Sequence, residues 1–90
     1  MKIVWDASKR LRNLEIHRID FADARERFAF EDAAIAPTRP GTDGRTRFIA
    51  IGPLDGRIVT IVFSSLGTEA LSLISVRRAS RKERKAYDQQ

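Results

Sequence analysis

"RTRFIAIGPLDGRIVTIVFS", residues 45–64, is the stretch that decides the fold. It contains two runs, 45–52 and 57–64, whose β-branched and aromatic residues are typical of strands. "PLDG" (53–56) joins the runs, and its Asp-Gly pair indicates a tight hairpin turn. Side chains alternate between the two faces of a strand. In the first run, one face carries Phe48, Ala50 and Gly52, and the other carries Arg45, Arg47, Ile49 and Ile51.

Upstream of this hairpin, the sequence predicts one strand and two helices. "KIVW" (2–5) is a short apolar run and the first expected strand. Asp6 follows it as a favourable N-cap, because its carboxylate can accept the free N–H groups of a helix running to about His17. Asp20 is the N-cap of a second helix. The buried stripe of that helix is formed by Phe21, Ala24 and Phe28.

The remaining strands are predicted on either side of the hairpin. "AAIA" (33–36) could form a short edge strand, whereas "PTRPGTDG" (37–44) is expected to be a loop because it holds two prolines and two glycines. After the hairpin, "EALSLISV" (69–76) is the third strand of an antiparallel meander. The order is strand, two helices, three or four antiparallel strands and a last helix, which indicates the α+β class in a single domain, 1–90.

The C-terminal segment concentrates the charge of the chain. Ser80 and Glu83 are spaced as a capping box for a helix that runs to Asp88. This helix has almost no apolar stripe, so we expect it to dock through Tyr87. Residues 77–88 hold six basic and two acidic residues, which account for +4 of the net charge of +5. Such a basic surface suits a phosphate polymer or an acidic partner protein, or is simply a solvated helix.

Composition excludes several classes of protein. The chain has no cysteine, which removes disulfides, cysteine zinc sites and thiol nucleophiles. It has one histidine and no glycine-rich phosphate loop, so neither a metal site nor a cofactor is expected. No run is long enough to span a membrane and the N-terminus has no apolar signal core, so we expect a cytoplasmic protein.

The first expected helix has a polar stripe, because Lys9, Asn13 and His17 follow one another at intervals of four residues. Leu11 and Leu14 mark a different face of that helix. Histidine exchanges protons near neutral pH, so His17 could act as a general acid or base. Alternatively, it only complements the negative end of the helix dipole.

Two pairs of arginines are candidate phosphate ligands. Arg45 and Arg47 begin a strand on one face, where they could clamp a phosphate or serve as solubility charges. Arg77 and Arg78 precede a helix N-terminus, whose N–H groups also attract phosphate. If the strand continues without a break, Arg77 shares a face with Leu71, Leu73 and Ser75.

Two motifs near the ends of the chain are specific in combination. The first is "WDASKRLRNLEIH" (5–17) and the second is "ISVRRASRKERKAY" (74–87). With Phe21 and Ile51–Gly52 between them, they closely resemble the BrnT-type toxins of bacterial type II toxin–antitoxin systems over residues 4–88. The resemblance implies a RelE-like toxin fold with a mainly antiparallel sheet of three to five strands, two N-terminal helices and one C-terminal helix.

The resemblance also implies a function. It suggests a ribonuclease that needs no metal and inhibits translation, with RNA as substrate. It suggests a ribbon-helix-helix antitoxin of the BrnA type, through which the complex binds operator DNA. The residues expected in catalysis are His17, Arg47, Arg77, Glu83 and Tyr87, and those expected to bind RNA are Lys9, Asn13, Arg45, Arg78, Arg81, Lys82 and Lys85.

Two departures from the family pattern keep an alternative open. Relatives commonly have glycine after the helix-ending histidine, where this chain has Arg18. Relatives also often carry arginines in the turn after the long strand and just before the next strand, whereas this chain has no basic residue between Arg57 and Arg77. A shortage of phosphate ligands would leave a catalytically weak or inactive toxin fold that only assembles with an antitoxin. A third hypothesis, RNA binding without cleavage, is weakened by the few aromatic residues, 8% of the chain.

Overall fold

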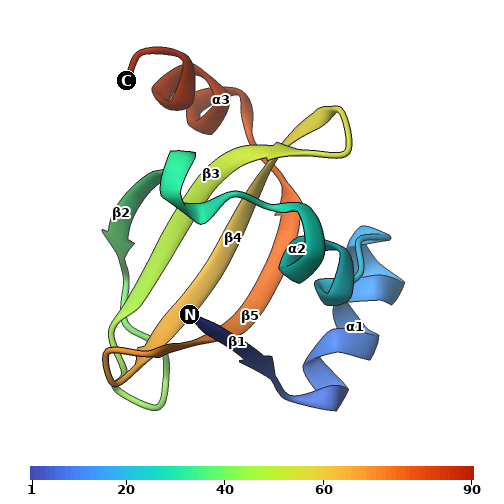
Figure 1. The fold of residues 1–90 in the computed structure, drawn as a ribbon, viewed down its shortest axis with the longest axis vertical. Helices are drawn as coiled ribbons and strands as arrows, with labels where there is room; N and C mark the ends of the chain where they lie inside the picture. Colours follow the sequence, from blue (N-terminus) through green and yellow to red (C-terminus); the bar gives the residue numbers. More distant parts are fainter.

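The computed structural model describes residues 1–90 and contains one five-stranded sheet with three α-helices (Figure 1). The elements in chain order are β1 (Lys2–Trp5), α1 (Ala7–His17), α2 (Phe21–Arg27), the 3-10 turn η1 (Phe30–Asp32), β2 (Ala34–Thr38), β3 (Arg47–Leu54), β4 (Arg57–Leu66), β5 (Ala70–Arg78) and α3 (Arg81–Asp88). The sheet order is β1-β5-β4-β3-β2. Only β1 pairs in parallel, so the α+β prediction is confirmed with a mixed sheet.

The central hairpin forms as the sequence predicts. β3 and β4 pair from Arg47 opposite Ser64 to Leu54 opposite Arg57. Both turn residues have positive φ, 51° for Asp55 and 83° for Gly56, which matches the twist of the flanking strands. The predicted loop 37–44 is partly wrong, because Pro37 and Thr38 belong to β2. An edge strand tolerates Pro37 because its missing N–H need not join a ladder.

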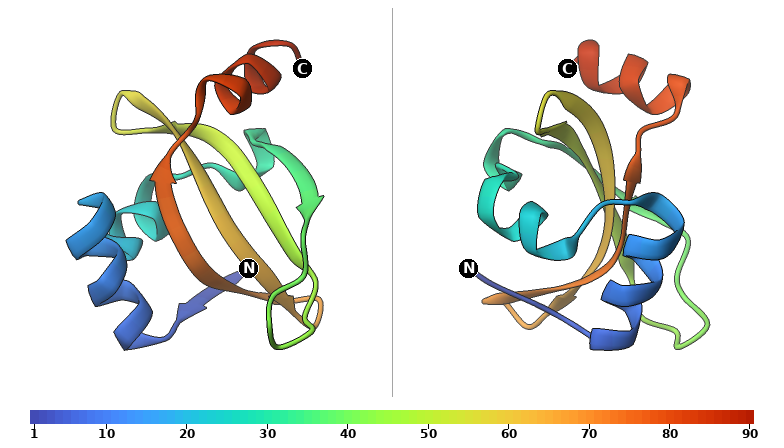
Figure 2. Two further views of the ribbon diagram at one scale, coloured as in Figure 1. Left: turned by 180° about the vertical axis from the view of Figure 1, so that it is seen from behind. Right: turned by 90° about the vertical axis from the view of Figure 1, so that its right-hand side faces the viewer.

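One face of the sheet, here called the α2 face, is covered by α2 and η1 (Figures 1 and 2). The predicted stripe of α2 is confirmed, since Phe21, Ala24 and Phe28 are all buried there. They pack against side chains from three strands, namely Ala50, Leu54, Val59, Ile61, Phe63, Leu71, Leu73 and Val76. Burying a side chain of this size contributes about 1.5–3 kcal/mol, so this face supplies most of the apolar stabilisation.

Helix α1 lies along β5 on the opposite side of the sheet from α2, and its two faces are reversed relative to an ordinary amphipathic helix (Figure 2). Leu11 is 66% exposed, whereas Asn13, from the polar stripe, is only 4% exposed. The reason is the length of β1, which ends at Trp5 and leaves the edge of β5 unpaired beyond Leu73. The Asn13 amide donates to Val76 O (2.9 Å) and accepts from Val76 N (3.0 Å). It therefore replaces the missing strand, as buried backbone groups require.

A β-bulge in β5 overturns the face predicted for Arg77. Val62 pairs with Ser75 but Phe63 pairs with Leu73, so Ile74 is an extra residue. The extra residue reverses the alternation. Leu71 and Leu73 therefore face α2, whereas Ser75 and Arg77 face the other way.

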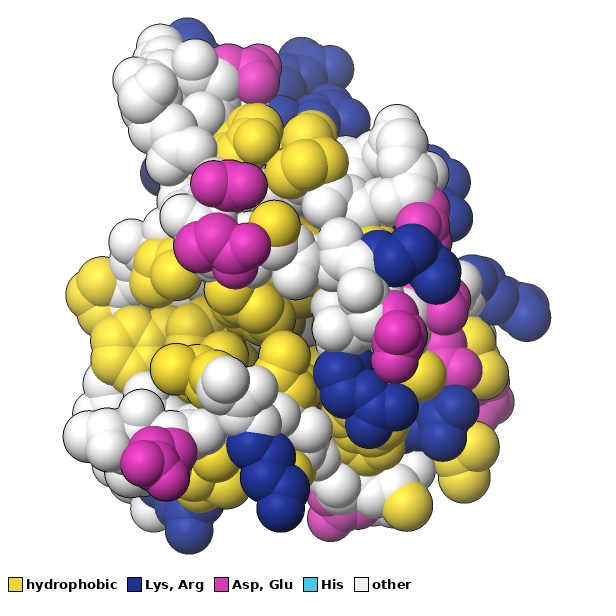
Figure 3. Space-filling view, viewed as in Figure 1, with side chains coloured by type: hydrophobic (Ala, Val, Ile, Leu, Met, Phe, Trp, Pro, Cys, Tyr) yellow, Lys and Arg dark blue, Asp and Glu magenta, His cyan; other side chains and the backbone are white.

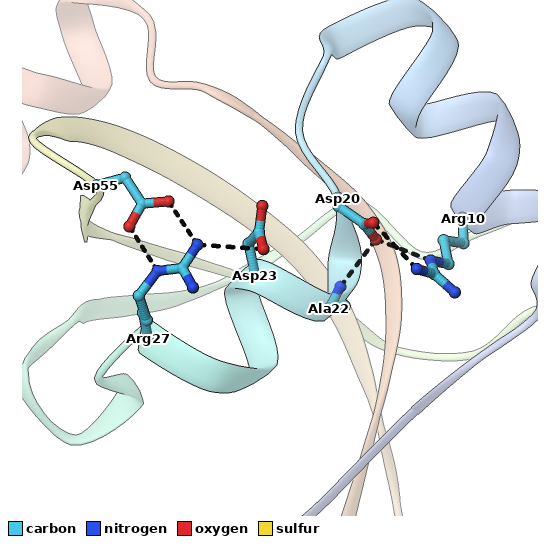
Figure 4. A network of polar contacts seen from close by, with 6 residues as sticks. All are labelled: Arg10, Asp20, Ala22, Asp23, Arg27 and Asp55. Carbon is cyan, nitrogen blue, oxygen red and sulfur yellow. Dashed lines mark hydrogen bonds and ion pairs between the residues drawn. The ribbon is translucent and has the colours of Figure 1, made fainter.

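Ion pairs connect the helices to their neighbours (Figure 4). Arg10 of α1 binds Asp20, the N-cap of α2, with Nε 2.8 Å from Oδ1. Arg27 of α2 binds Asp55 in the hairpin turn at 2.6 Å and Asp23 at 3.1 Å. The Arg10 pair lowers the pKa of Asp20, and the Arg27 pair lowers the pKa of Asp55. These pairs are largely exposed, so solvent screening keeps their contribution to the stability of the fold small.

Beside β2, apolar side chains gather into a shallow groove lined by Met1, Phe30, Ile35, Phe63 and Leu71 (Figure 3). Ile35 on β2 is half exposed. None of the helices is long and apolar enough to cross a membrane.

Candidate active site

The candidate site lies on the second face of the sheet, here called the α3 face. From register and alternation, this face carries Arg47, Ile49 and Ile51 of β3, Thr60, Val62 and Ser64 of β4, and Ser75 and Arg77 of β5. Helix α3 contacts β3 on this side and covers one end of the face (Figure 2). Thr60 and Ser64 are buried although they are polar, so this face is held together differently from the α2 face.

Glu83 is the centre of a polar network at the α3 end of this face. Arg77 binds it through two hydrogen bonds, Nη1 to Oε1 at 2.7 Å and Nη2 to Oε2 at 2.9 Å. Oε1 also accepts from Thr60 Oγ1 at 3.0 Å and from Ser80 N at 2.8 Å. The last contact completes the predicted capping box, because Ser80 Oγ accepts from Glu83 N.

This network fixes the charge of Glu83. The Arg77 guanidinium, then the Ser80 N–H and the Thr60 hydroxyl, lower the pKa of Glu83 to about 2 against the cost of burial. The Glu83 carboxylate raises the pKa of Arg77 in turn. A carboxylate with so low a pKa is a poor proton acceptor at neutral pH. Glu83 is thus suited to hold Arg77 in place, and Arg77 keeps N–H groups that Glu83 does not use.

His17 ends α1 and lies half-buried at the wall of an open pocket of about 230 Å³. The pocket lies between α1 and β5 and is lined by Lys9, Arg12, Asn13, Ile16, His17, Ile74 and Ser75. Ser75 and Arg77 are two residues apart and on the same face of β5, so they are about 7 Å apart along the strand. The pocket and the Arg77–Glu83 pair are therefore neighbours.

Arg47 is separated from this group. Arg47 pairs with Ser64 on β4, whereas Arg77 pairs with Thr60. Ser64 and Thr60 are four residues apart, which is about 13 Å along the strand. The Arg47 Nε is buried without a hydrogen-bond partner, and Gly41 lies so close that a Cβ there would be 2.5 Å from Arg47 Cζ. The sheet thus does not bring Arg47 and Arg77 to one phosphate.

The other predicted residues have varied positions. Arg45 is exposed in the loop before β3, so its predicted place on a strand face is wrong. The predicted RNA contact of Asn13 conflicts with its burial, since its amide also donates to Ile19 O and is fully used inside the protein. Tyr87 is half-buried on α3. The cations Arg78, Arg81, Lys82 and Lys85 are exposed and form no ion pairs.

Sequence reasoning missed Thr60 and Arg12. Thr60 is a lone polar residue within the apolar run of β4, which is a detectable signal for a strand whose second face is not hydrophobic. Arg12 lies three residues after Lys9, and so on the same side of α1. The structure contains no group of three or more His, Cys, Asp or Glu residues that could hold a metal ion.

Comparison with known proteins places this α+β chain among the ribonuclease toxins of type II toxin–antitoxin systems. The matching family model, "Ribonuclease toxin, BrnT, of type II toxin-antitoxin system", covers residues 5–83, so the chain belongs to the BrnT family. The crystal structure of the Brucella abortus ribonuclease toxin BrnT is similar, with 44% identity and a TM-score of 0.74. The match covers 90% of this chain and 99% of that chain.

No match is found among curated proteins. The family match confirms the resemblance seen in the sequence and identifies a ribonuclease toxin of a toxin–antitoxin system, which implies an antitoxin as partner. The relation to RelE-like toxins stays a prediction.

Proposed function

We propose that this toxin cleaves RNA without a metal, using the 2′-hydroxyl next to the scissile phosphate as nucleophile. The 2′-oxygen attacks phosphorus and the 5′-oxygen of the next nucleotide leaves, so the products are a 2′,3′-cyclic phosphate and a 5′-hydroxyl. The reaction needs a base, an acid and cations for the charged transition state. The observation that carries the proposal is the Arg77–Glu83 pair beside the His17 pocket.

In this proposal Arg77 binds the scissile phosphate and Glu83 is a positioning residue. Two hydrogen bonds hold the guanidinium in one orientation, which removes the entropy cost of fixing a long side chain when substrate binds. His17 transfers the proton, because an imidazole can both accept and donate a proton and this is the one histidine of the chain. Tyr87 and the α3 cations assist through contacts with the RNA backbone.

The family implies an antitoxin as partner. We propose that a ribbon-helix-helix antitoxin neutralises this toxin, and that the complex binds operator DNA through the antitoxin. Cleavage of RNA by the free toxin inhibits translation in the cytoplasm. The exposed cations of α3 supply the field that attracts either RNA or an acidic antitoxin surface.

Purified wild-type protein incubated with a defined RNA and excess EDTA tests the proposal. We expect fragments ending in a 2′,3′-cyclic phosphate. Arg77→Lys keeps the charge but loses the bidentate pair, so we expect kcat to fall at least about tenfold. Arg57→Lys, on the other face of the sheet, is the matched control and should cleave like wild type. Intact RNA with wild type, or cleavage only with added divalent metal, would contradict the proposal.

The alternative of a catalytically weak binding module keeps some support. Arg47 is covered by the loop that contains Gly41, and the stretch between Arg57 and Arg77 supplies no further cation. If this alternative holds, the toxin co-purifies with its antitoxin while the free protein leaves RNA intact.

A further inference from the structure

The pocket between α1 and β5 contains a pair of cations that the proposed chemistry does not use. Lys9 and Arg12 lie on one side of α1, and neither takes part in any of the four ion pairs of the protein. No carboxylate lines this pocket. Asp6 lines the adjoining hollow together with Lys9 and Arg12, and it accepts from Ser8 N (2.8 Å) and Ser8 Oγ (2.6 Å). The lining of the pocket itself thus carries a net positive charge.

These cations line the same pocket as His17 but are set back from it along α1. Five to eight residues separate them from His17 along α1, which is about 7–12 Å along the helix axis. Charge stabilisation in a transition state requires contact, at roughly 3 Å. An RNA strand with more than one phosphate can therefore contact Arg77 with one phosphate and these cations with another.

The floor of the pocket favours a nucleotide over a free anion. Ile16 and Ile74 provide apolar surface next to the cations, and Ile16 is largely exposed. The bulge brings Ile74 into the lining, together with the Ser75 hydroxyl, which is only weakly engaged with Asn13 Oδ1 at 3.4 Å. A ribonucleotide offers a phosphate for Lys9 and Arg12, hydroxyls for Ser75, and an apolar ring face for the two isoleucines.

We propose that the α1–β5 pocket is a subsite for a flanking nucleotide of single-stranded RNA, with Lys9 and Arg12 as its phosphate ligands. This inference rests on the proposed function and deepens it. The single strand runs from the α3 end of the sheet, past Arg77 and His17, and down the side of α1. The subsite provides binding energy at a distance from the reacting bond and makes the toxin prefer RNA longer than a dinucleotide.

The test uses a 2′-O-methyl decanucleotide, which binds but cannot be cleaved because the nucleophile is blocked. The variants are Arg12→Gln and Lys9→Gln/Arg12→Gln, with Arg57→Gln on the other face as the charge-matched control. Anisotropy titrations at several salt concentrations give Kd and its salt dependence. We expect the double variant to bind about tenfold more weakly, with the salt slope reduced by roughly 0.7 for each phosphate that the protein no longer neutralises. The control should bind like wild type.

A second readout separates the subsite from the catalytic residues. With a ribodinucleotide, which has no flanking phosphate, Arg12→Gln should cleave as fast as wild type. With a ribodecanucleotide its KM should rise while kcat is preserved. Wild-type binding with no change in the double variant would overturn the subsite but leave the ribonuclease proposal intact. Wild type that neither binds nor cleaves RNA would overturn both.

Discussion

The two faces of the same sheet are stabilised by different forces. The α2 face buries Phe21, Val59 and Ile61 completely, in a core cluster made only of hydrophobic side chains. The α3 face and the edge beside it depend on the hydrogen bonds of Asn13 and Glu83. Apolar packing tolerates changes of pH, whereas a carboxylate network does not. The contrast shows that apolar packing stabilises one face of this sheet, whereas the proposed chemistry lies on the other.

The largest expected effect is on the α2 face. Phe21→Ala removes a fully buried ring from the centre of the core and leaves a cavity, so we expect a loss of about 4 kcal/mol in the free energy of unfolding. Urea denaturation measures it. Leu11→Ala, which removes an exposed side chain on α1, should change stability by less than about 0.5 kcal/mol. Similar losses for the two variants would contradict the assignment of the core.

Asn13→Ala tests the edge of β5. It leaves Val76 N–H, Val76 C=O and Ile19 C=O without partners, so we expect a loss of about 3 kcal/mol. The matched control is Arg12→Ala at the neighbouring, exposed position. Hydrogen exchange adds a local readout, since the Val76 amide should lose protection in Asn13→Ala. If that amide stays protected, the side chain does not replace a strand.

Acid should weaken the Glu83 network of the α3 face. Folding lowers the pKa of Glu83 from 4.5 to about 2, so its contribution is complete above about pH 5 and is lost as pH falls through 2. The contribution is up to about 3 kcal/mol, from the size of that shift. Glu83→Gln should flatten stability against pH over this range, while Phe21→Ala should lower the curve without changing its shape. Parallel curves for wild type and Glu83→Gln would contradict this.

The smallest expected effect is at Arg18, in the link between α1 and α2. Arg18 has φ of 61°, the left-handed conformation that favours glycine, and its N–H donates to Leu14 O at the end of α1. Arg18→Gly should therefore stabilise the protein by up to about 1 kcal/mol, since relief of strain exceeds the added freedom of the unfolded chain. The rise in Tm measures it. A lower Tm would show that the Arg18 side chain contributes packing that outweighs the strain.

Local patterns predicted most of the fold. The Asp55-Gly56 turn, the N-caps at Asp6 and Asp20, and the capping box all formed where the sequence indicated, because each depends on neighbouring residues. The errors occurred where distant segments decide the outcome. The burial of Asn13 depends on β1 ending early, and the face of Arg77 depends on a bulge set by pairing with β4.

The same distinction applies to the candidate site. Several residues of the α3 face were named from the sequence, but Thr60 was missed and the grouping was not predicted. Arg77 and Glu83 were both named, yet the pair itself requires the turn at Ser80 to bring α3 back over the sheet. Arg12 was overlooked because the helix face was assigned from Leu11 and Leu14, which point away from the sheet.

The three contacts of the Glu83 carboxylate limit which residues can replace it in evolution. One carboxylate starts α3, satisfies Thr60 and holds Arg77. Gln would retain a cap but lose the charge, and Asp is one methylene too short to reach every partner. At the exposed cations of α3, one basic residue can replace another, so these positions could vary in sequence. At position 83 a single substitution would alter the helix and the arginine together, so neither can change without the other.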